Sequence, residues 1–305
     1  MTQDPQQLVV LSGKGGTGKT SVTAALAHLA SQEMAVSLAD ADVDAANLEL
    51  VLGPEREATR DFASGLLAHV DAATCIACGE CEAACRFDAI HPSSSKSKTK
   101  GAAYEVDPIA CEGCAACHYR CPVGAIEMTE PVVGQWFVSR TPYGPLYHAH
   151  LFAGGENSGK LVTLVKQQAR LRALDDARPL VLVDGPPGIG CPVISAASGA
   201  TLALLVVEPT PAGAHDLARV LELTRHFKIP ALALLNKADL SAPRAAEIAA
   251  FCAEQQTPII ARLPYDSIVT EAMVNGQAVT AYTDGPVAQA LREAWAEIKA
   301  RLGLI

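Results

Sequence analysis

The sequence predicts an α/β fold with a mostly parallel sheet, into which a second, small α+β domain is inserted. Three observations support this prediction. Short apolar runs typical of buried strands alternate with helical segments through most of the chain. A glycine-rich segment, residues 13–20, follows the first apolar run and opens a helix. Eight of the ten cysteines are gathered between Cys75 and Cys121, where the alternation stops.

The strands and helices of the larger domain follow from these apolar runs. The first strand is expected at Leu8–Leu11, and the helix after the glycine-rich segment is expected to reach Ser31. A hairpin is predicted at 135–138 and 145–148. Further strands are expected at 36–42, 181–184, 202–207, 231–236 and 258–262, and helices at 161–174, 212–227, 244–255 and 287–302. The predicted domains are therefore 1–71 with 132–305, and an insert at 72–131.

The glycine-rich segment has the pattern of a phosphate-binding P-loop. Its position between a strand and a helix supports this interpretation. Glycines allow backbone amides to surround phosphates, Lys19 would reach the β and γ oxygens, and the Thr20 hydroxyl would bind Mg²⁺. The predicted nucleotide-binding residues here are Gly13, Gly15, Gly16, Thr17, Gly18, Lys19, Thr20 and Ser21.

Two acids are expected at the sheet edge where parallel strands place ligands. Asp40 and Asp184 each follow an apolar run, and carboxyl ends of parallel strands meet at one edge. Asp42 and Asp44 could belong to the site, or they could instead cap a helix or lie in a loop. We favour this second, structural role for Asp44.

The P-loop resembles the deviant Walker A motif of the MinD and ParA branch of P-loop ATPases, because it carries a second lysine, Lys14. This resemblance implies an ATP-sandwiched homodimer in which Lys14 reaches the partner's phosphates. It also implies catalytic roles for Lys14, Lys19, Asp40 and Asp184. Asp40 would position the attacking water, and Asp184, at the Walker B position, would hold Mg²⁺ through a water. The alternative for Lys14 is an ordinary solvated loop lysine.

The same resemblance suggests where the base binds. Asn236 is placed on the base edge, and Pro264 lies in the late loop that packs on the base in this family. Asp239 completes an N-K-x-D string typical of guanine recognition, so GTP stays an alternative to ATP, the expected nucleotide.

The cysteines form two C-x-x-C-x-x-C-x-x-x-C runs, which resemble a bacterial two-cluster ferredoxin. In that pattern the last cysteine of each run crosses to the other cluster. The resemblance implies two [4Fe-4S] clusters, one held by Cys75, Cys78, Cys81 and Cys121, the other by Cys111, Cys114, Cys117 and Cys85.

Disulfides and structural zinc are the alternatives for these thiols. Residues 1–7 have neither the basic nor the apolar region of a secretory signal, which favours a cytoplasmic chain without disulfides. Zinc sites usually show paired C-x-x-C units rather than triple runs. Arg86 stands where the ferredoxin pattern often has proline, whereas Pro122 follows the second run.

Net charge and hydropathy disfavour two classes of function, nucleic-acid binding and membrane insertion. A net charge of -9 argues against broad binding to nucleic acid. No apolar run is long enough to predict membrane insertion.

The segment 93–100 has the composition of a basic loop, and Asn157, Ser158 and Lys160 are candidate switch or interface residues.

Nearly the whole chain resembles ferredoxin-containing MinD-type ATPases. This implies an ATPase, pairing with itself or with a paralogous ATPase, that couples its nucleotide state to electron transfer or metallocluster maturation. The acceptor would be a redox or metallocluster protein that the sequence does not identify. Two alternatives stay open: a positioning or carrier ATPase that uses the ferredoxin segment for docking, and an iron–sulfur cluster donor.

Overall fold

The computed structural model describes residues 4–96, 101–155 and 157–304, which divide into two compact units. Unit 1 comprises Met1–Arg60, Gln135–Leu151 and Ser158–Ile305. Unit 2 comprises Asp61–Gly134 and Phe152–Asn157. The predicted insert, 72–131, falls inside unit 2.

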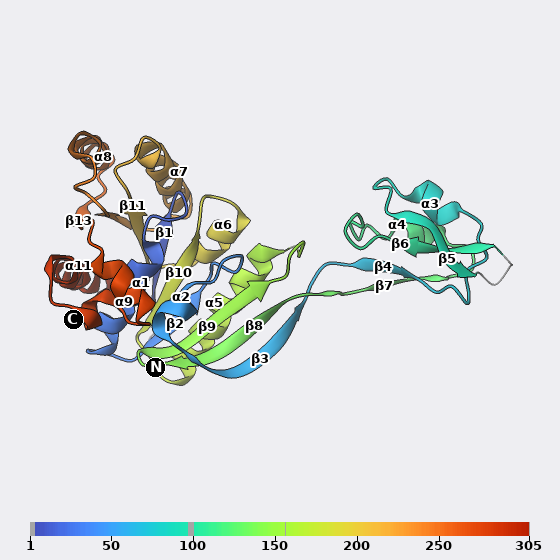
Figure 1. The fold of residues 1–305 in the computed structure, drawn as a ribbon, viewed down its shortest axis with the longest axis horizontal. Helices are drawn as coiled ribbons and strands as arrows, with labels where there is room; N and C mark the ends of the chain where they lie inside the picture. Colours follow the sequence, from blue (N-terminus) through green and yellow to red (C-terminus); the bar gives the residue numbers. More distant parts are fainter. Residues whose placement is uncertain (1–3, 97–100, 156, 305) are drawn as a thin grey trace. The chain divides into compact units, whose positions relative to one another are not determined.

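Unit 1 is built on a nine-stranded sheet in the order β13-β12-β11-β1-β10-β2-β9-β8-β3 (Figure 1). The strands from β13 to β9 pair in parallel, which confirms the predicted α/β class. The strands are β1 (Gln6–Ser12), β2 (Val36–Asp40), β3 (Glu55–Ala63), β8 (Val132–Thr141), β9 (Gly144–Leu151), β10 (Leu180–Pro187), β11 (Leu202–Val207), β12 (Ala231–Leu235) and β13 (Ile259–Arg262).

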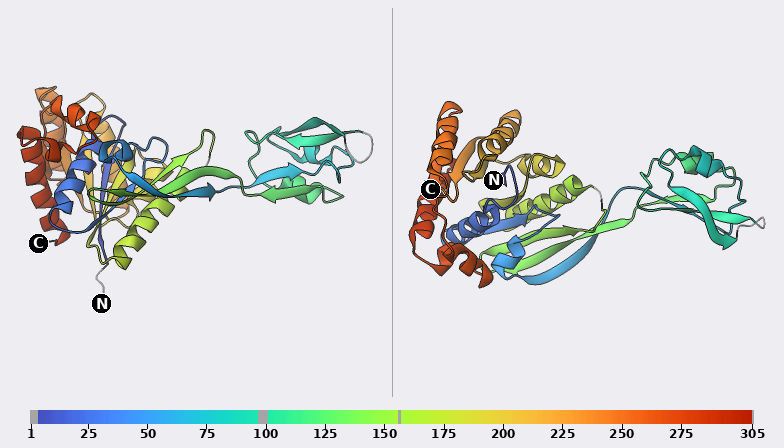
Figure 2. Two further views of the ribbon diagram at one scale, coloured as in Figure 1. Left: turned by 60° about the horizontal axis from the view of Figure 1, so that its bottom comes forward. Right: turned by 45° about the horizontal axis from the view of Figure 1, so that its top comes forward.

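Helices cover both faces of this sheet (Figure 2). One face packs against α1 (Lys19–Ser31), α10 (Val279–Tyr282) and α11 (Pro286–Leu302), with Leu8, Val10, Leu38 and Leu182 in the shared core. Burying such a side chain contributes roughly 1.5–3 kcal/mol. The other helices are α2 (Leu48–Leu52), α5 (Ser158–Asp175), α6 (Cys191–Ala197), α7 (Gly213–His226), α8 (Ala242–Glu254) and α9 (Ile268–Val274). Of these, α5, α6 and α7 contact the sheet.

Unit 2 has a small core in which cysteines take part. Its two sheets pair β4 (Leu67–Val70) with β7 (Ile126–Thr129), and β5 (Ile90–Lys96) with β6 (Ala102–Val106), both antiparallel. Two short helices, α3 (Glu80–Ala84) and α4 (Ala116–Arg120), follow the cysteine loops. Cys75, Cys81 and Cys117 are buried among a few aliphatic side chains.

Three elements differ from the sequence-based expectation. Residues 93–96 of the expected basic loop belong to β5, because they continue a strand that pairs with β6, whereas residues 97–100 lie outside the described part. The strand β3 was not predicted, because its mostly exposed residues lack an apolar pattern. The second strand ends at Asp40 rather than Asp42, where the chain turns into a loop.

Candidate functional site

The loop between β1 and α1 forms one wall of a cleft in unit 1. Gly16 and Gly18 have φ angles of 79° and 86°, which favour glycine. A Cβ atom on Gly18 would also lie 2.3 Å from Nδ2 of Asn236. The cleft has a volume of about 920 Å³, within the usual size range of small-molecule sites. Of the predicted binding residues, Gly15 to Ser21, Asn236 and Pro264 line it, whereas Gly13 lies behind the loop, against Asp216.

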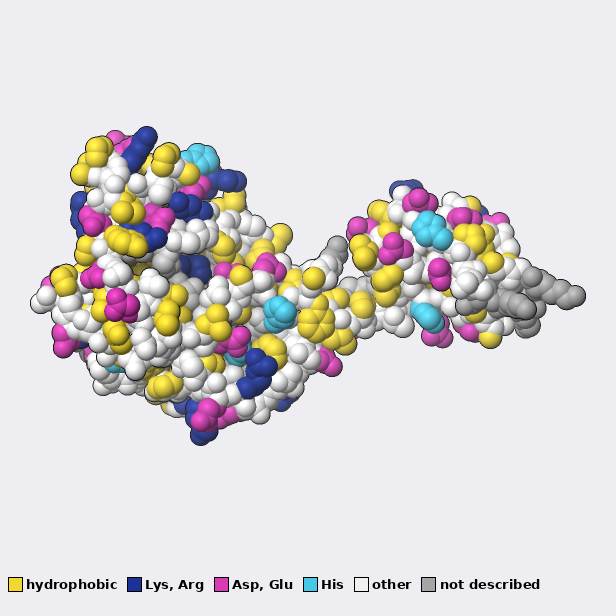
Figure 3. All heavy atoms as spheres, viewed as in Figure 1, with side chains coloured by type: hydrophobic (Ala, Val, Ile, Leu, Met, Phe, Trp, Pro, Cys, Tyr) yellow, Lys and Arg dark blue, Asp and Glu magenta, His cyan; other side chains and the backbone are white. Residues whose placement is uncertain are grey.

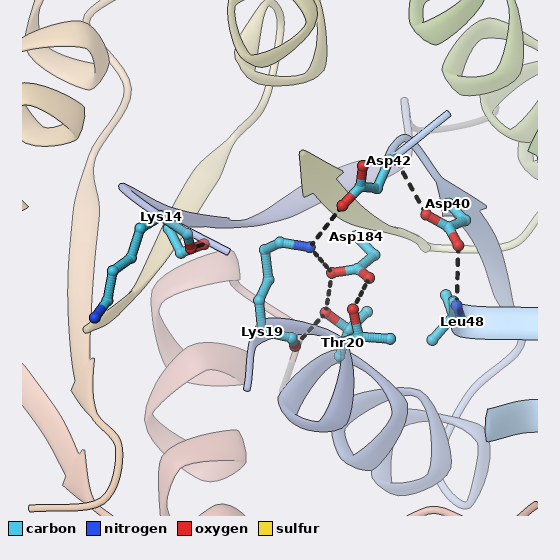
Figure 4. A network of polar contacts seen from close by, with 9 residues as sticks. Lys14, Lys19, Thr20, Asp40, Asp42, Leu48 and Asp184 are labelled. Carbon is cyan, nitrogen blue, oxygen red and sulfur yellow. Dashed lines mark hydrogen bonds and ion pairs between the residues drawn. The ribbon is translucent and has the colours of Figure 1, made fainter. Parts of the chain in front are cut away.

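The P-loop lysine is anchored on a carboxylate of the neighbouring strand (Figure 4). Nζ of Lys19 lies 3.1 Å from Oδ1 of Asp184 and 4.0 Å from Oδ2 of Asp42. The hydroxyls of Thr20 and Thr23 donate to Asp184 at 2.7 and 2.9 Å. The structure therefore brings together Lys19, Thr20 and Asp184, as the sequence predicts.

Burial and mutual charge shift the pKa values of this cluster. Burial raises the pKa of Asp40 to about 8, helped by repulsion from Asp184, which it faces on the adjacent strand. Burial also raises the pKa of Asp42 to about 6, against the attraction of Lys19. Burial alone would lower the pKa of Lys19, but attraction to Asp184, Asp40 and Asp42 outweighs it and the pKa is raised. Lys19 therefore stays a cation at neutral pH.

The two acids after β2 occupy different positions. Asp40 is fully buried and accepts hydrogen bonds from the backbone amides of Asp42, at 3.1 Å, and Leu48, at 3.0 Å. Asp42 lines the cleft, as does Asp44. Asp40 thus holds the loop in shape, and Asp42 is the carboxylate that faces the space beside Lys19.

The second lysine of the P-loop points away from this cluster (Figure 4). Nζ of Lys14 donates to the Thr210 hydroxyl at 3.1 Å and lies 3.3 Å from Oε2 of Glu208. Glu208 also pairs with Lys237 through its other oxygen. Within this chain, Lys14 is directed away from the cleft.

The predicted base-binding residues, Asn236 and Pro264, also line the cleft. Nδ2 of Asn236 donates to the Thr17 carbonyl at 2.8 Å and so ties β12 to the P-loop. Asp239 accepts the Tyr265 amide at 2.7 Å, which fixes the loop that contains Pro264. Asn236 therefore positions the P-loop as well as lining the cleft.

Eight cysteines of unit 2 line two separate cavities. The first cavity is lined by Cys75, Cys78, Cys81 and Cys121, with Tyr104 and Ile126 beside them. The second cavity is lined by the other four, Cys85, Cys111, Cys114 and Cys117. Each cavity thus takes three cysteines from one run and the fourth from the other, as the ferredoxin pattern predicts.

The thiols of these cavities are not drawn together around a point. All ten cysteines are free, and across the described residues no three metal-ligating side chains gather closely enough to hold one ion. Backbone amides approach three sulfurs: Ala77 with Cys75 at 3.5 Å, Ala89 with Cys85 at 3.4 Å, and Ala125 with Cys121 at 3.2 Å. The donor set is therefore four spaced thiols per cavity.

The candidate switch residues and the two other cysteines line neither the cleft nor the cysteine cavities. Ser158 begins α5, Lys160 is exposed in its first turn, and Asn157 precedes it with a φ angle of 69°. Cys252 is buried in α8, and Cys191 is exposed at the start of α6.

The sequence matches a family model along most of its length. Residues 8–279 match the nucleotide-binding domain described as CbiA: CobQ/CobB/MinD/ParA nucleotide binding domain. The chain belongs to this family.

Three archaeal proteins and several solved structures are similar to this CobQ/CobB/MinD/ParA member. Protein MJ0578 of Methanocaldococcus jannaschii is 31% identical over 76% of this chain and 78% of its own. ATP-binding protein MJ0547 of the same organism is 25% identical over 95% of this chain and 86% of its own. MinD of Pyrococcus horikoshii with Mg-ADP has a TM-score of 0.60 at 20% identity, covering 98% of each chain. The likeness to MinD concerns the fold.

Sequence reasoning missed two side chains that organise the site of this family member. Thr23 donates to both the Lys19 carbonyl and Asp184. Glu208 bridges Lys14 of the P-loop and Lys237, which follows β12. The position of Glu208 directly after the apolar strand β11 resembles that of Asp40 and Asp184 and was the available signal.

The surface of this CobQ/CobB/MinD/ParA member shows mixed charge. On the face shown in Figure 3, acidic and basic side chains are interspersed. None of the described helices combines the length and apolar character needed to cross a bilayer.

Proposed function

We propose that this chain is an ATP-hydrolysing, homodimeric iron–sulfur protein that couples its nucleotide state to electron transfer or metallocluster maturation on a partner protein. The observation that carries the proposal is the sorting of eight cysteines into two cavities in a chain that also has a P-loop cleft. A phosphate-binding site alone would fit many functions of the family.

The nucleotide part of the proposal rests on the charge arrangement of the cleft. Lys19 and the amides of the P-loop would hold the phosphates, and Thr20 with Asp184 would hold Mg²⁺. A relative is named an ATP-binding protein, and MinD of P. horikoshii was solved with Mg-ADP. Both names support ATP over GTP.

Hydrolysis transfers the γ-phosphoryl group of ATP to water, giving ADP and phosphate. The sequence assigns the positioning of that water to Asp40, but Asp42 is the acid that lines the cleft. A pKa of about 6 leaves Asp42 largely ionised at neutral pH, able to orient a water or accept its proton. Asp40 would act by holding the loop on which Asp42 lies.

The cysteine cavities fit [4Fe-4S] clusters better than zinc. A structural zinc needs four ligands about 2.3 Å from one ion, and the described thiols do not converge in that way. A four-iron cube is larger, and its thiolates are correspondingly further apart. The apolar lining and the amides near sulfur match the surroundings of protein-bound clusters. When bound, such clusters supply one-electron transfer.

The proposal is tested on full-length protein purified without oxygen. We expect about eight iron and eight sulfide per chain, together with Mg²⁺-dependent ATP hydrolysis. The reduction potential is then titrated by EPR with and without a non-hydrolysable ATP analogue. If nucleotide and electrons are coupled, the analogue binds the reduced and the oxidised protein with different affinities. Each tenfold difference between these affinities shifts the potential of a one-electron couple by about 59 mV.

Each part of the proposal has its own contrary result. Protein that takes up zinc but no iron under reconstitution would overturn the iron–sulfur assignment. Clusters whose potential and reoxidation rate are both indifferent to nucleotide would overturn the coupling and favour a docking or carrier role. Transfer of iron to an apo-acceptor at the same rate as electron transfer would favour a cluster donor.

A further inference from the structure

The side chain of Glu208 forms ion pairs with two lysines near the P-loop. Glu208 follows β11 directly, and its side chain is 9% exposed. One carboxylate oxygen pairs with Lys14, from the first turn of the P-loop, and the other with Lys237, which follows the cleft residue Asn236. A single carboxylate thus pairs with two lysines that belong to different elements.

The contacts of Lys14 keep its amine on Glu208. Nζ of Lys14 lies 3.3 Å from Glu208 and donates to Thr210 at 3.1 Å. The backbone of Lys14 is fixed separately, because its carbonyl accepts the Ser12 hydroxyl at 2.8 Å. Freeing the amine therefore requires only a change of side-chain rotamers.

We propose that Glu208 is a latch: it holds Lys14 within the single chain, and Lys14 must leave it to reach the phosphates bound by a second copy. The inference rests on the proposed function, because it assumes the ATP-dependent homodimer. Glu208 is a positioning residue that acts through Lys14 and touches no nucleotide.

Lys237 makes this latch reversible. A buried carboxylate left without any cation would be costly, so a simple Lys14–Glu208 pair would resist opening. Here Lys237 stays on the other oxygen when Lys14 leaves, and it has a further contact with the Gly16 carbonyl at 3.4 Å. Release of Lys14 therefore costs one partly exposed ion pair and the hydrogen bond to Thr210, since the Lys14 side chain is 35% exposed.

The latch is tested first in nucleotide-free protein. Glu208→Gln removes the charge and keeps the size of the side chain. We expect the Lys14 amine to react about threefold to fivefold faster with an acetylating reagent, followed by mass spectrometry of the Lys14 peptide. Glu222→Gln, the same change at an exposed position of α7, is the matched control and should leave the rate unchanged.

Dimerisation is measured next, by sedimentation with a non-hydrolysable ATP analogue. Glu208→Gln should lower the dimer Kd about threefold to fivefold, because less is lost when Lys14 departs. Lys14→Ala should raise the dimer Kd, and adding Glu208→Gln to it should have no further effect. The double variant also corrects for any influence of Glu208 exerted through Lys237.

The outcomes separate the latch from the proposed homodimer. Wild-type protein that binds the analogue but stays monomeric would overturn the homodimer and the latch with it. Wild-type protein that dimerises, while Glu208→Gln dimerises no more tightly, would overturn the latch alone. The latch is equally overturned if Glu208→Gln changes the dimer Kd as much in the Lys14→Ala background as in the wild type.

Discussion

The carboxylate of Asp40 accepts a hydrogen bond of 3.0 Å from the backbone amide of Leu48, the first residue of α2. Its other oxygen accepts the Asp42 amide. The buried Asp40 side chain at the end of β2 thus connects the beginning and the end of the following loop, and it holds Asp42 at the cleft. The role of Asp40 in the site is therefore structural as well as electrostatic.

Replacing Asp40 by asparagine should destabilise the protein. The amide nitrogen of asparagine cannot accept a hydrogen bond, so either the Asp42 or the Leu48 amide loses its acceptor in a buried setting. We expect the free energy of unfolding to fall by about 1–3 kcal/mol, measured by urea denaturation near pH 4, where the raised pKa of Asp40 adds little to the difference between the variant and the wild type.

The matched control is Asp44→Asn, in the same loop but exposed. It should change the free energy of unfolding by less than about 0.5 kcal/mol. Equal losses for the two variants would contradict the role assigned to the Asp40 hydrogen bonds.

Asp40 should also make stability depend on pH. Its pKa is raised from 3.8 to about 8, so the folded protein holds a proton there that the unfolded chain releases. Stability from this group is greatest at low pH and is lost as the pH rises toward 8. His148 acts oppositely below pH 6.5, because burial lowers its pKa to about 4.

Between pH 6.5 and 8 the titrations of Asp42 and His148 are mostly complete, and Lys166, whose pKa burial lowers to about 8, opposes the Asp40 effect only near the upper end. We expect the free energy of unfolding to fall by about 1–2 kcal/mol across this range, because one proton is worth at most about 1.4 kcal/mol per pH unit. Asp40→Asn should flatten this slope. A slope that survives in the variant would assign the titration to another group.

Removing Lys19 should disable the nucleotide site and leave unit 2 intact. Lys19→Ala takes away the shared cation of Asp40, Asp42 and Asp184. We expect hydrolysis to fall at least about 100-fold and the free energy of unfolding to fall by about 3 kcal/mol. Iron content should equal that of the wild type.

Arg219→Ala, which removes one exposed positive charge from α7, serves as the control and should hydrolyse ATP normally. Joint loss of iron and hydrolysis in Lys19→Ala would show that the two units do not load independently.

Single cysteine changes should follow the crossed arrangement of the cavities. Cys121→Ser should damage the first cavity, although Cys121 belongs to the second run, and Cys85→Ser should damage the second cavity. Each variant should lose roughly half of the iron. EPR of the reduced variants should show a different remaining signal in each.

Cys252→Ser is the control for these variants, because Cys252 is a buried thiol of α8 in unit 1. It should keep its full iron content. Identical remaining signals in Cys121→Ser and Cys85→Ser would rule out the crossed assignment.

Much of unit 1 could be predicted because its strands are continuous buried runs. Leu202–Val207 is buried at every position and was predicted with its exact bounds. Strand β3 could not be predicted, because at the edge of the sheet its side chains are mostly exposed and leave no apolar signal. Residues 93–96 of β5 were not predicted as strand because their serines and lysine have the composition of a loop.

The sequence could predict which residues form the candidate site, but not the directions in which their side chains point. The end of an apolar strand indicates that Asp40 lies at the sheet edge. Whether Asp40 or Asp42 faces the cleft depends on the turn after β2 and on backbone amides at the two ends of the loop that leads to α2. The attachment of Lys14 to Glu208 joins positions 194 residues apart, which no local pattern reveals.

The exchange of one cysteine between the two cavities has a consequence for how the protein is made. Neither half of unit 2 can complete its own set of four thiols, because each takes its last member from the other run. During synthesis the second set of four is complete once Cys117 has left the ribosome, whereas the first set must wait for Cys121. Under the proposed function, a chain that stops between Cys85 and Cys111 could therefore load neither cluster, although four of its eight cavity cysteines would already be present.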